Sequence, residues 1–441
     1  MKQIGWIKSL IAAFLVALLP GISLSTDVLI WKQVAMVSRT QVASAVLNGN
    51  LYYIGGIDSA MTPSDTVGKL NLATGLAGLG TPLGLINARS GACAVACGST
   101  LYVIGGENSK TMVLLDDTMN LNGNLWSNFN ATTMNIARVN FGAVVIDNKI
   151  YAFGGLNAKS MGDAQMEVTE DLATGLGWDS SASSLLANMN VGRWRFAYAE
   201  VNGRIYVMGG QNGAMPAGAL ASVEIYDPVA DTWTYGPSMP KARAGGCAAA
   251  INGKIFVFPG QPASPSEAAT ATVFVLDTAT NQWTTITPIV SSGNPSQYDR
   301  SAVVYGNKIY LVGGMGFSMA TAGTIDEVSI LDPSVNAPND GKMQIRNNII
   351  NVNRTGARQN MKAYILIKGT AGKSFTLAVY SRAGLWLGDI VTSGVIGSDG
   401  SVVVIFDGTV ASGKKLNSGS YWIVGGGGVK DRQPIMVINE N

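Results

Sequence analysis

Short alternating runs of apolar residues recur along the first three quarters of the chain, always in the same order. An Arg precedes a run of small and apolar residues, a polar turn, a second apolar run rich in aromatic residues and a Gly-Gly pair. The clearest copy occupies residues 88–108, with Arg89 near its start and Gly105-Gly106 near its end. Other copies begin at Arg39, Arg138, Arg193 and Arg243, and the last reaches Gly313-Gly314. Self-similarity at intervals of about 50 residues predicts a solenoid or a propeller.

The copy that begins at Arg193 shows what each repeat is expected to form. Apolar runs at residues 196–201 and 205–208 flank Asn202-Gly203, which is a strong signal for a β-hairpin. A third run at residues 223–227 and a fourth that begins at Thr232 follow. Four short antiparallel strands in about 50 residues correspond to one propeller blade. The pattern therefore predicts an all-β fold.

A family resemblance rests on the glycine pair and the aromatic residues of this same copy. Gly209-Gly210, Tyr226 and Trp233 stand in the order of the Kelch motif, in which an apolar strand is followed by Gly-Gly, a Tyr and a Trp. Residues 28–333 resemble the Kelch family over six such copies, although some copies lack the Tyr or the Trp. The resemblance implies a Kelch β-propeller.

The two ends of the repeat region complement each other. The last copy has no Trp-bearing fourth strand, whereas the segment from Trp31 to Arg39 mirrors the segment from Trp233 to Arg243. A strand near the chain start that completes the last blade would remove the free sheet edges of an open ring. We therefore expect a six-bladed Kelch propeller closed by the N-terminal strand.

The first residues have the layout of a secretory signal peptide. Lys2 and Lys8 precede the apolar run Ile11–Leu19, and small residues follow at Ser23 and Ser25. An uncleaved N-terminal anchor is the alternative, but the apolar run is shorter than the roughly 20 residues that span a bilayer. The layout predicts cleavage near Ser25 and a secreted, periplasmic or cell-surface protein.

The last hundred residues depart from the repeat. Alternating runs between Ala363 and Ile438 predict six or seven short strands in a small β-sandwich. The runs at residues 375–384 and 416–422 resemble FlgD-type immunoglobulin-like domains, and the resemblance covers residues 345–441. It implies a module that presents, anchors or helps to export what precedes it, and a plain stabilising sandwich is the alternative. The expected domains are a signal peptide at 1–25, a propeller at 26–340 and a sandwich at 341–441.

Composition excludes several classes of function. Charged residues make up 13% of the chain and the net charge is +2, whereas a nucleic-acid surface needs clustered Lys and Arg. The chain contains no His, which excludes Ser-His-Asp and Cys-His catalysis and His-bearing metal sites. The three Cys are expected to be small free thiols, chiefly buried. No phosphate-binding or dinucleotide motif is present, so we predict no catalytic residue, no cofactor and no metal.

Candidate binding residues follow from the geometry of a blade. Its first two strands are antiparallel, so the repeated Arg and the residue after Gly-Gly lie on one face of the disc. A residue that recurs in every blade is expected to be structural, and residues that break the repeat are better candidates. Together they combine aromatic rings, Arg and carboxylates, as sites for sugars do; a filled channel mouth is the alternative. The predicted ligand-binding set is Glu107, Trp194, Arg195, Gln211, Tyr298, Asp299 and Arg300.

These observations predict an exported, non-enzymatic binding or adhesion protein that recognises a glycan or a surface protein through the propeller face. A nucleic-acid partner and a membrane span after signal cleavage are not expected. One open alternative is a periplasmic Kelch mutarotase or epimerase for sialic-acid-type sugars. There Glu107 or Asp299 would transfer protons and Arg195 or Arg300 would hold a carboxylate. The other open alternative is a structural component of a cell-envelope assembly.

Overall fold

The computed structural model contains only β-strands among the residues that it describes, so the all-β prediction is confirmed. The described residues are 28–74, 77–78, 85, 87–108, 113–122, 125–128, 133–159, 162–173, 177–179, 186–213, 218–262, 271–290, 294–316, 323–331, 343–346, 349–351, 363–368, 372–381, 385–395, 401–406, 409–417, 419–427 and 432–438. The signal peptide expected at residues 1–25 lies outside them.

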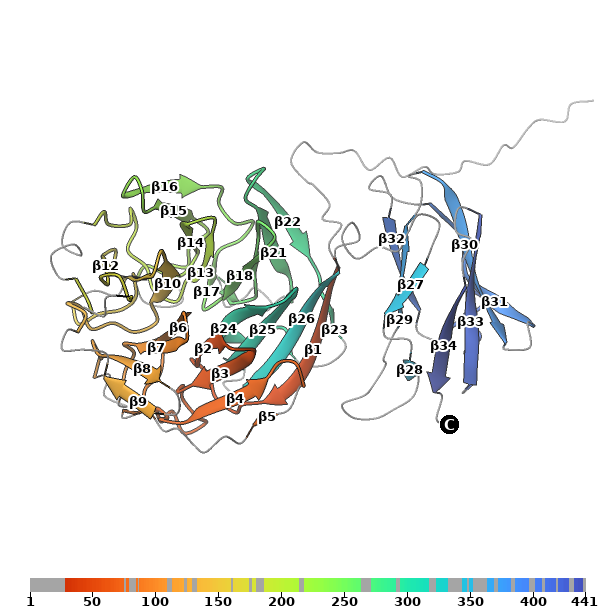
Figure 1. The fold of residues 1–441 in the computed structure, drawn as a ribbon. Helices are drawn as coiled ribbons and strands as arrows, with labels where there is room; N and C mark the ends of the chain where they lie inside the picture. Colours follow the sequence, from red (N-terminus) through yellow and green to blue (C-terminus); the bar gives the residue numbers. More distant parts are fainter. Residues whose placement is uncertain are drawn as a thin grey trace, which may run out of the picture.

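Each of the first five repeats forms its own antiparallel sheet, with strands in chain order from the centre of the disc outward (Figure 1). The first sheet is β2 (Ala43–Leu47), β3 (Asn50–Ile54), β4 (Val67–Asn71) and β5 (Ala77–Gly78). The second is β6 (Cys93–Cys97), β7 (Thr100–Ile104), β8 (Thr118–Asn122) and β9 (Leu125–Asn128). The third is β10 (Gly142–Ile146), β11 (Lys149–Phe153) and β12 (Met166–Val168).

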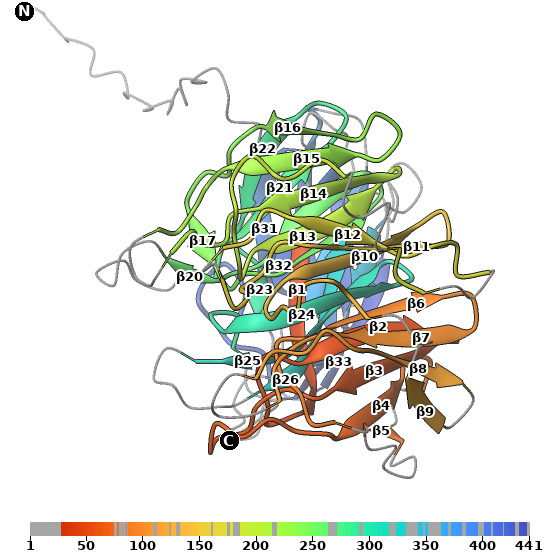
Figure 2. The same cartoon turned by 90° about the vertical axis from the view of Figure 1, so that its left-hand side faces the viewer.

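The next two repeats follow the same plan. The fourth sheet is β13 (Ala197–Val201), β14 (Arg204–Met208), β15 (Val223–Asp227) and β16 (Thr232–Gly236). The fifth is β18 (Ala248–Ile251), β19 (Lys254–Val257), β21 (Val273–Asp277) and β22 (Gln282–Ile286), beside the short pair β17 (Arg243–Ala244) and β20 (Gln261–Pro262). Figure 2 shows several of these sheets layered against one another.

The inner hairpins have the turns that the sequence predicts. Asn202 and Gly203 have φ of 53° and 75°, and Val201 pairs with Arg204 across them. Positive φ at both central residues defines a type I′ turn, whose twist matches that of the flanking strands. Asn48-Gly49 and Asn252-Gly253 adopt the same φ signs at the same place in their repeats.

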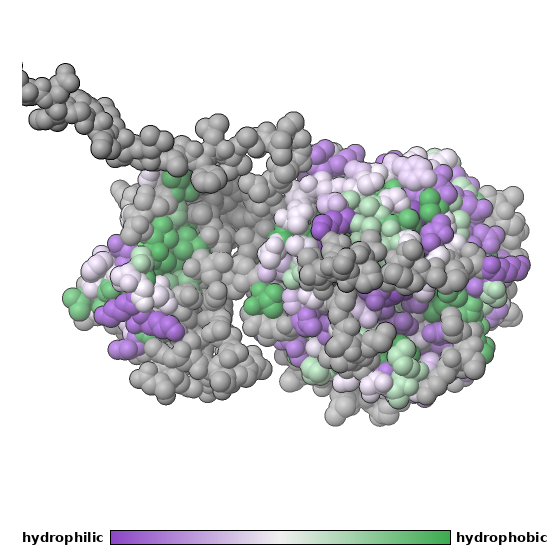
Figure 3. Space-filling model, turned by 180° about the vertical axis from the view of Figure 1, so that it is seen from behind, coloured by the Kyte–Doolittle hydropathy of each residue, from purple (hydrophilic) through white to green (hydrophobic). Residues whose placement is uncertain are grey.

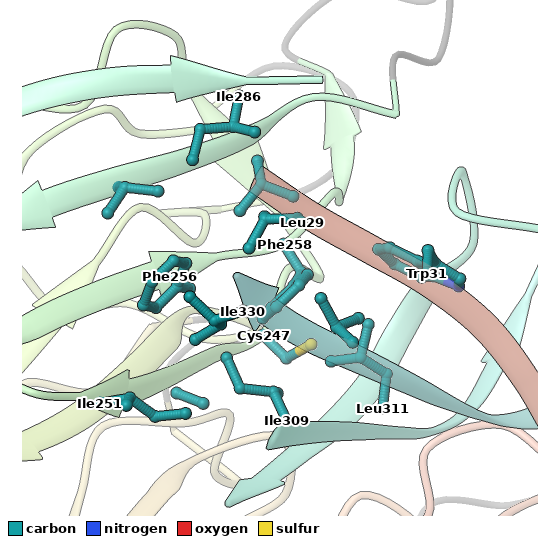
Figure 4. Packing of buried hydrophobic residues seen from close by; sticks show 14 residues of the cluster. Leu29, Trp31, Cys247, Ile251, Phe256, Phe258, Ile286, Ile309, Leu311 and Ile330 are labelled. Atoms are coloured by element: carbon teal, nitrogen blue, oxygen red, sulfur yellow. The ribbon is translucent and has the colours of Figure 1, made fainter. Parts of the chain in front are cut away.

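The strand nearest the chain start belongs to the last sheet of the repeat region. That sheet has the order β23 (Ile289–Val290), β1 (Val28–Met36), β26 (Thr324–Leu331), β25 (Lys308–Met315) and β24 (Tyr298–Tyr305). β1 pairs antiparallel with β26 from Val28 opposite Leu331 to Met36 opposite Thr324. Figure 4 shows Leu29 and Trp31 of β1 in a buried cluster, and the Trp31 ring lies 5.8 Å from the Phe258 ring.

Apolar side chains from adjacent sheets interlock to form the core. One cluster joins Ile54 of the first sheet to Leu101 of the second, and another joins Met208 of the fourth to Ile255 of the fifth. The inner strands β2, β6, β10, β13, β18 and β24 contact one another in that order, and β2 also contacts β24. The sheets therefore pack face to face around a common centre.

The C-terminal residues form two further sheets with a core of their own. The smaller sheet is β27 (Met343–Arg346), β29 (Ala363–Lys368) and β32 (Ser401–Phe406). The larger sheet is β28 (Ile349–Asn351), β34 (Arg432–Ile438), β33 (Gly419–Gly427), β30 (Ser374–Ser381) and β31 (Trp386–Val395). Ile365 from the smaller sheet and Leu377 from the larger sheet are both fully buried in one cluster. This arrangement is a β-sandwich.

Polar and apolar residues alternate over the propeller surface that Figure 3 shows. Scattered exposed apolar side chains are normal on a soluble domain. No part of the chain that the structure describes forms a helix of the length and hydropathy that a bilayer span requires.

Candidate functional site

The Arg that recurs in each repeat is buried and holds the Gly-Gly turn. Arg89, Arg138 and Arg193 donate through Nη1 to the carbonyl of the first Gly of their own repeat, at 3.0, 2.8 and 2.9 Å. Arg39 bonds to Gly55 in the same way. Arg243 departs slightly, because it bonds to Val257 and stacks on the Phe274 ring at 3.5 Å. The structural role expected for these residues is therefore confirmed.

A carboxylate on or beside the third strand accompanies several of these Arg residues. Arg193 Nη2 lies 2.5 Å from Glu224, and both side chains are fully buried. Glu224 also accepts the backbone N–H groups of Asn190 and Val191, so one carboxylate joins the Arg to the preceding loop. Burial of such a pair requires that its remaining hydrogen-bonding groups be satisfied. The pair therefore ties the loop, the turn and the third strand together.

Arg300, predicted as a site residue, has this same structural position in the last repeat. Its Nε donates to the Gly313 carbonyl at 3.1 Å and its Nη2 to Asp326 at 2.8 Å, and its side chain is 2% exposed. Gln297 accepts a further bond from it. Arg300 lies three residues later in its repeat than the repeated Arg does in the others, and the longer strand β24 compensates for this shift. The structure places Arg300 inside the blade, and we leave it out of the site.

The residues two places after each repeated Arg, and Asp299 in the last repeat, form a cycle of backbone hydrogen bonds, here called the backbone ring. Each N–H donates to the carbonyl of the preceding repeat at 2.7–3.1 Å, and the Gln41 N–H donates to Asp299. All six have φ between 51° and 66°, the left-handed region that favours Gly and Asn. The members are Gln41, Gly91, Asn140, Arg195, Gly245 and Asp299.

Two predicted site residues meet directly over this ring. The Arg195 guanidinium contacts the Asp299 carboxylate through Nε at 2.9 Å and Nη2 at 2.7 Å. A Cβ at Gly245 would lie 2.5 Å from Asp299 Oδ1, so the pair passes directly over this glycine. Arg195 Nη1 also donates to Gln261 Oε1 at 3.0 Å. The guanidinium is thus already bound on two sides.

Aromatic rings flank this ion pair, as the sequence predicts. Arg195 Cζ lies 5.8 Å from the Trp194 ring and 5.7 Å from the Tyr298 ring. Trp194 Nε1 donates to the Gly213 carbonyl at 3.3 Å, and Tyr298 is buried. Four predicted residues, namely Trp194, Arg195, Tyr298 and Asp299, therefore form one cluster.

Three side-chain oxygens near the ring are buried and have no partner among the described residues. They are Gln41 Oε1, Glu107 Oε2 and Gln211 Oε1. Gln41 belongs to the backbone ring. The backbone groups of Glu107 pair with those of Ser90 beside the ring, and the backbone groups of Gln211 pair with those of Trp194. All three are acceptors, and a buried unpaired acceptor costs about 1–3 kcal/mol. Because these oxygens are enclosed by the protein, a partner on the surface does not reach them directly.

Burial raises the pKa of the Glu107 carboxyl above its usual value, and the bond from the Ser90 hydroxyl, 3.2 Å from Oε1, partly offsets this. A raised pKa means that ionisation of Glu107 costs more in the folded chain than in the unfolded chain. The protonated Glu107 carboxyl therefore contributes stability below the ordinary Glu pKa, and this contribution is lost as the pH rises through the raised pKa.

Glu107→Gln is accordingly expected to make the chain more stable than the wild type at pH 7, with a smaller difference at pH 4, where Glu107 is largely protonated. Urea unfolding at both pH values measures the difference. Glu200→Gln is the control, because Glu200 is exposed. If the difference in stability between Glu107→Gln and the wild type were smaller at pH 7 than at pH 4, the raised pKa of Glu107 would be contradicted.

A cavity of about 460 Å³ follows the axis and is lined by the six inner strands. Each inner strand pairs on one side only, so its free edge faces this cavity. The hydroxyls of Ser44 and Ser301 bond to each other at 2.6 Å. Burial raises the pKa of the Cys93 and Cys247 thiols to about 12 each, which keeps them protonated and unreactive. All three cysteines are free.

The chemistry available at this site is recognition through hydrogen bonds and ring stacking. Arg195 is occupied by Asp299 and Arg300 lies in the blade interior, so neither guanidinium is open to a substrate carboxylate. Among the residues that the structure describes, no three Cys, Asp or Glu side chains gather as a metal ion would require. Glu107 Oε2, beside the ring, is buried and has no hydrogen-bond partner among the described residues.

Sequence comparison assigns the fold to a family. The KLHDC2/KLHL20/DRC7 Kelch-repeats domain matches residues 91–314, which is half of the chain. The chain belongs to the Kelch-repeat family. This Kelch match ends before the C-terminal sandwich, so its resemblance to FlgD-type domains stays a prediction.

Several Kelch proteins of plants and animals are similar to part of this chain. The F-box/kelch-repeat protein At1g67480 of Arabidopsis thaliana is 35% identical over 117 residues, which are 26% of this chain and 29% of that protein. The human Kelch repeat and BTB domain-containing protein 12 is 32% identical over 152 residues, 32% of this chain and 24% of that protein. Kelch-like protein 38 of Danio rerio is 29% identical over 145 residues, 32% of this chain and 22% of that protein. The chain thus spans less than a third of the length of these Kelch relatives.

These relatives correct one prediction. A secreted, periplasmic or cell-surface location is wrong, because it is contradicted by the matched Kelch proteins, among them an F-box protein and a BTB protein. The error arose from the Lys residues and the apolar run at the chain start, which follow the layout of a leader.

Proposed function

We propose that this Kelch protein is a non-enzymatic binding module that holds a partner protein on the face that carries the backbone ring. Kelch domains bind protein partners, and the similar proteins combine Kelch repeats with F-box or BTB domains. The partly exposed Trp194 ring beside the Arg195–Asp299 pair is the observation that carries the proposal to this face. Aromatic rings at a protein surface are common anchors for partner proteins.

The proposed scaffold is a closed six-bladed propeller at residues 26–340, followed by a sandwich at 341–441. Pairing of β1 with β26, contact of β2 with β24 and the six hydrogen bonds of the backbone ring support this count. A separate buried cluster in the C-terminal sheets supports the boundary. A rigid ring of this kind presents loops and ring-edge side chains in fixed positions.

The proposed contact set is smaller than the predicted one. Trp194 contributes aromatic surface, and the neutralised pair of Arg195 and Asp299 provides a polar floor. The partly exposed Glu107 lies beside the backbone ring, whereas Gln211 and Tyr298 are buried and support the face from below the surface. A face that combines the Glu107 carboxylate with a neutralised Arg disfavours an acidic ligand.

A displayed peptide library selected against the full chain tests this function. We expect enriched peptides to compete with one another and to bind Trp194→Ala about tenfold more weakly, because that substitution removes the aromatic anchor from the face. Tyr235→Ala is the matched control, because Tyr235 is 62% exposed on the outer strand β16 of the same blade. Enriched peptides that bind Trp194→Ala as well as the wild type, or no enrichment beside strong signals on a glycan array, would overturn the proposal.

A further inference from the structure

The larger sheet of the sandwich has one face in the core and one face turned outward. Phe375, Leu377 and Val379 of β30 are buried in the core, as is Ile423 of β33. Successive side chains of a strand point to opposite faces. Tyr380 and Trp422 therefore lie on the outward face. In Figure 1 this sheet is on the side of the sandwich away from the propeller.

Strand register places three aromatic residues in one row on this outward face. Tyr380 is directly opposite Trp422 on one side and Trp386 on the other. Leu387 packs against the core, so its neighbour Trp386 points outward, and Trp386 is 54% exposed. Residues directly opposite one another share a face, and strands lie about 4.8 Å apart. The aromatic row therefore spans about 10 Å across β31, β30 and β33.

A carboxylate stands beside this row on the same face. Asp389 is paired with Ala378, which is two residues from Tyr380 and hence outward as well. Its Oδ1 accepts a hydrogen bond from Trp386 Nε1 at 3.2 Å. No Lys or Arg of the described residues forms an ion pair with Asp389. The row thus combines aromatic surface, exposed at Trp386, with a carboxylate that has no cation partner among the described residues.

The edge of this sheet is protected, so its face is the available surface. β31 is the edge strand, and its pairing with β30 is interrupted by three register shifts. The Ala411 N–H also donates to the Asp389 carbonyl at 2.6 Å. Bulges and covered backbone groups hinder the addition of another strand. A partner would therefore contact the side chains of the aromatic row.

We propose that Trp386, Tyr380, Trp422 and Asp389 form a docking surface for an extended, Arg-bearing segment of a partner protein. A guanidinium stacks on Trp and Tyr rings and pairs with a carboxylate in one plane, so it matches this charge and shape together. Two copies of the chain that met with Asp389 at their two-fold axis would bring the two carboxylates together, which disfavours that arrangement. This surface is separate from the propeller face and does not depend on the function proposed there.

Titration of the full chain with the blocked peptide acetyl-Gly-Arg-Gly-Arg-Gly-amide, followed by NMR, tests the inference. We expect the same peptide with citrulline in place of both Arg residues to bind at least tenfold more weakly, since citrulline keeps the shape but lacks the charge. Asp389→Asn is expected to weaken the Arg peptide about tenfold and to reduce its salt dependence. Trp386→Ala and Tyr380→Ala are expected to weaken it by three- to tenfold.

Val395→Ala is the matched control, because Val395 is 59% exposed at the far end of the same strand. It should leave binding unchanged, as should Trp194→Ala on the propeller. Unfolding midpoints equal to that of the wild type exclude loss of fold in the variants. Equal binding of the Arg and citrulline peptides, no binding of either, tighter binding of maltohexaose at this face, or a dimer abolished by Trp386→Ala would each overturn the inference.

Discussion

Replacing Arg193 by Ala is expected to lower the free energy of unfolding by about 3–5 kcal/mol. The substitution leaves Glu224 as an uncompensated buried charge and removes the donor from the Gly209 carbonyl. Both groups are out of reach of water, so neither regains the lost bonds. Urea unfolding followed by tryptophan fluorescence measures the change.

Arg204→Ala is the matched control in the same blade. Arg204 also pairs with a carboxylate, Asp227, at 2.8 Å, but its side chain is 56% exposed. Exposed pairs contribute about 0–1 kcal/mol, because water replaces the partner. If Arg193→Ala and Arg204→Ala lowered the free energy of unfolding by similar amounts, burial would not be the reason why the repeated Arg stabilises the fold.

Trp31→Ala is expected to destabilise the chain by about 3–5 kcal/mol, the range for a large aromatic residue removed from a core. Trp31 is fully buried between β1 and the neighbouring sheet, and its Nε1 donates to Asp326 at 2.8 Å. Asp326 also binds Arg300, so loss of the Trp weakens the structural Arg of the last repeat as well. Thermal unfolding of both proteins measures the difference.

Trp386→Ala is the control for this second prediction. It removes the same side chain from an exposed position of the sandwich, where most substitutions change stability by less than about 0.5 kcal/mol. A small effect of Trp31→Ala, similar to that of Trp386→Ala, would mean that β1 is not needed to hold the last sheet.

The hairpins and the sandwich strands could be predicted because their signals are local. Asn202-Gly203 favours positive φ at two successive residues, and that preference alone defines the turn and its register. Alternation in residues 363–368 and 375–380 predicts two strands that the structure contains as β29 and β30. The short strands β27 and β28 were missed, since three or four residues give no readable period.

The candidate site was predicted only in part, because its contacts join distant parts of the chain. Aromatic residues beside Arg195 indicated a cluster, but the bond between Arg195 and Asp299 crosses 104 residues and an intervening repeat. No local signal shows that Arg300 turns inward to take the place of a repeated Arg. The backbone ring did leave a trace, since Gly91, Asn140 and Gly245 all tolerate left-handed φ, as the ring requires.

The backbone ring also affects how the repeat region unfolds. Open stacks of repeats fray from their end units, because a terminal repeat has one neighbour instead of two. A cycle of hydrogen bonds that returns from Asp299 to Gln41 has no end unit. Release of any one repeat must break contacts on both of its sides at once. We therefore expect loss of structure in this region to be a single cooperative event rather than progressive unravelling.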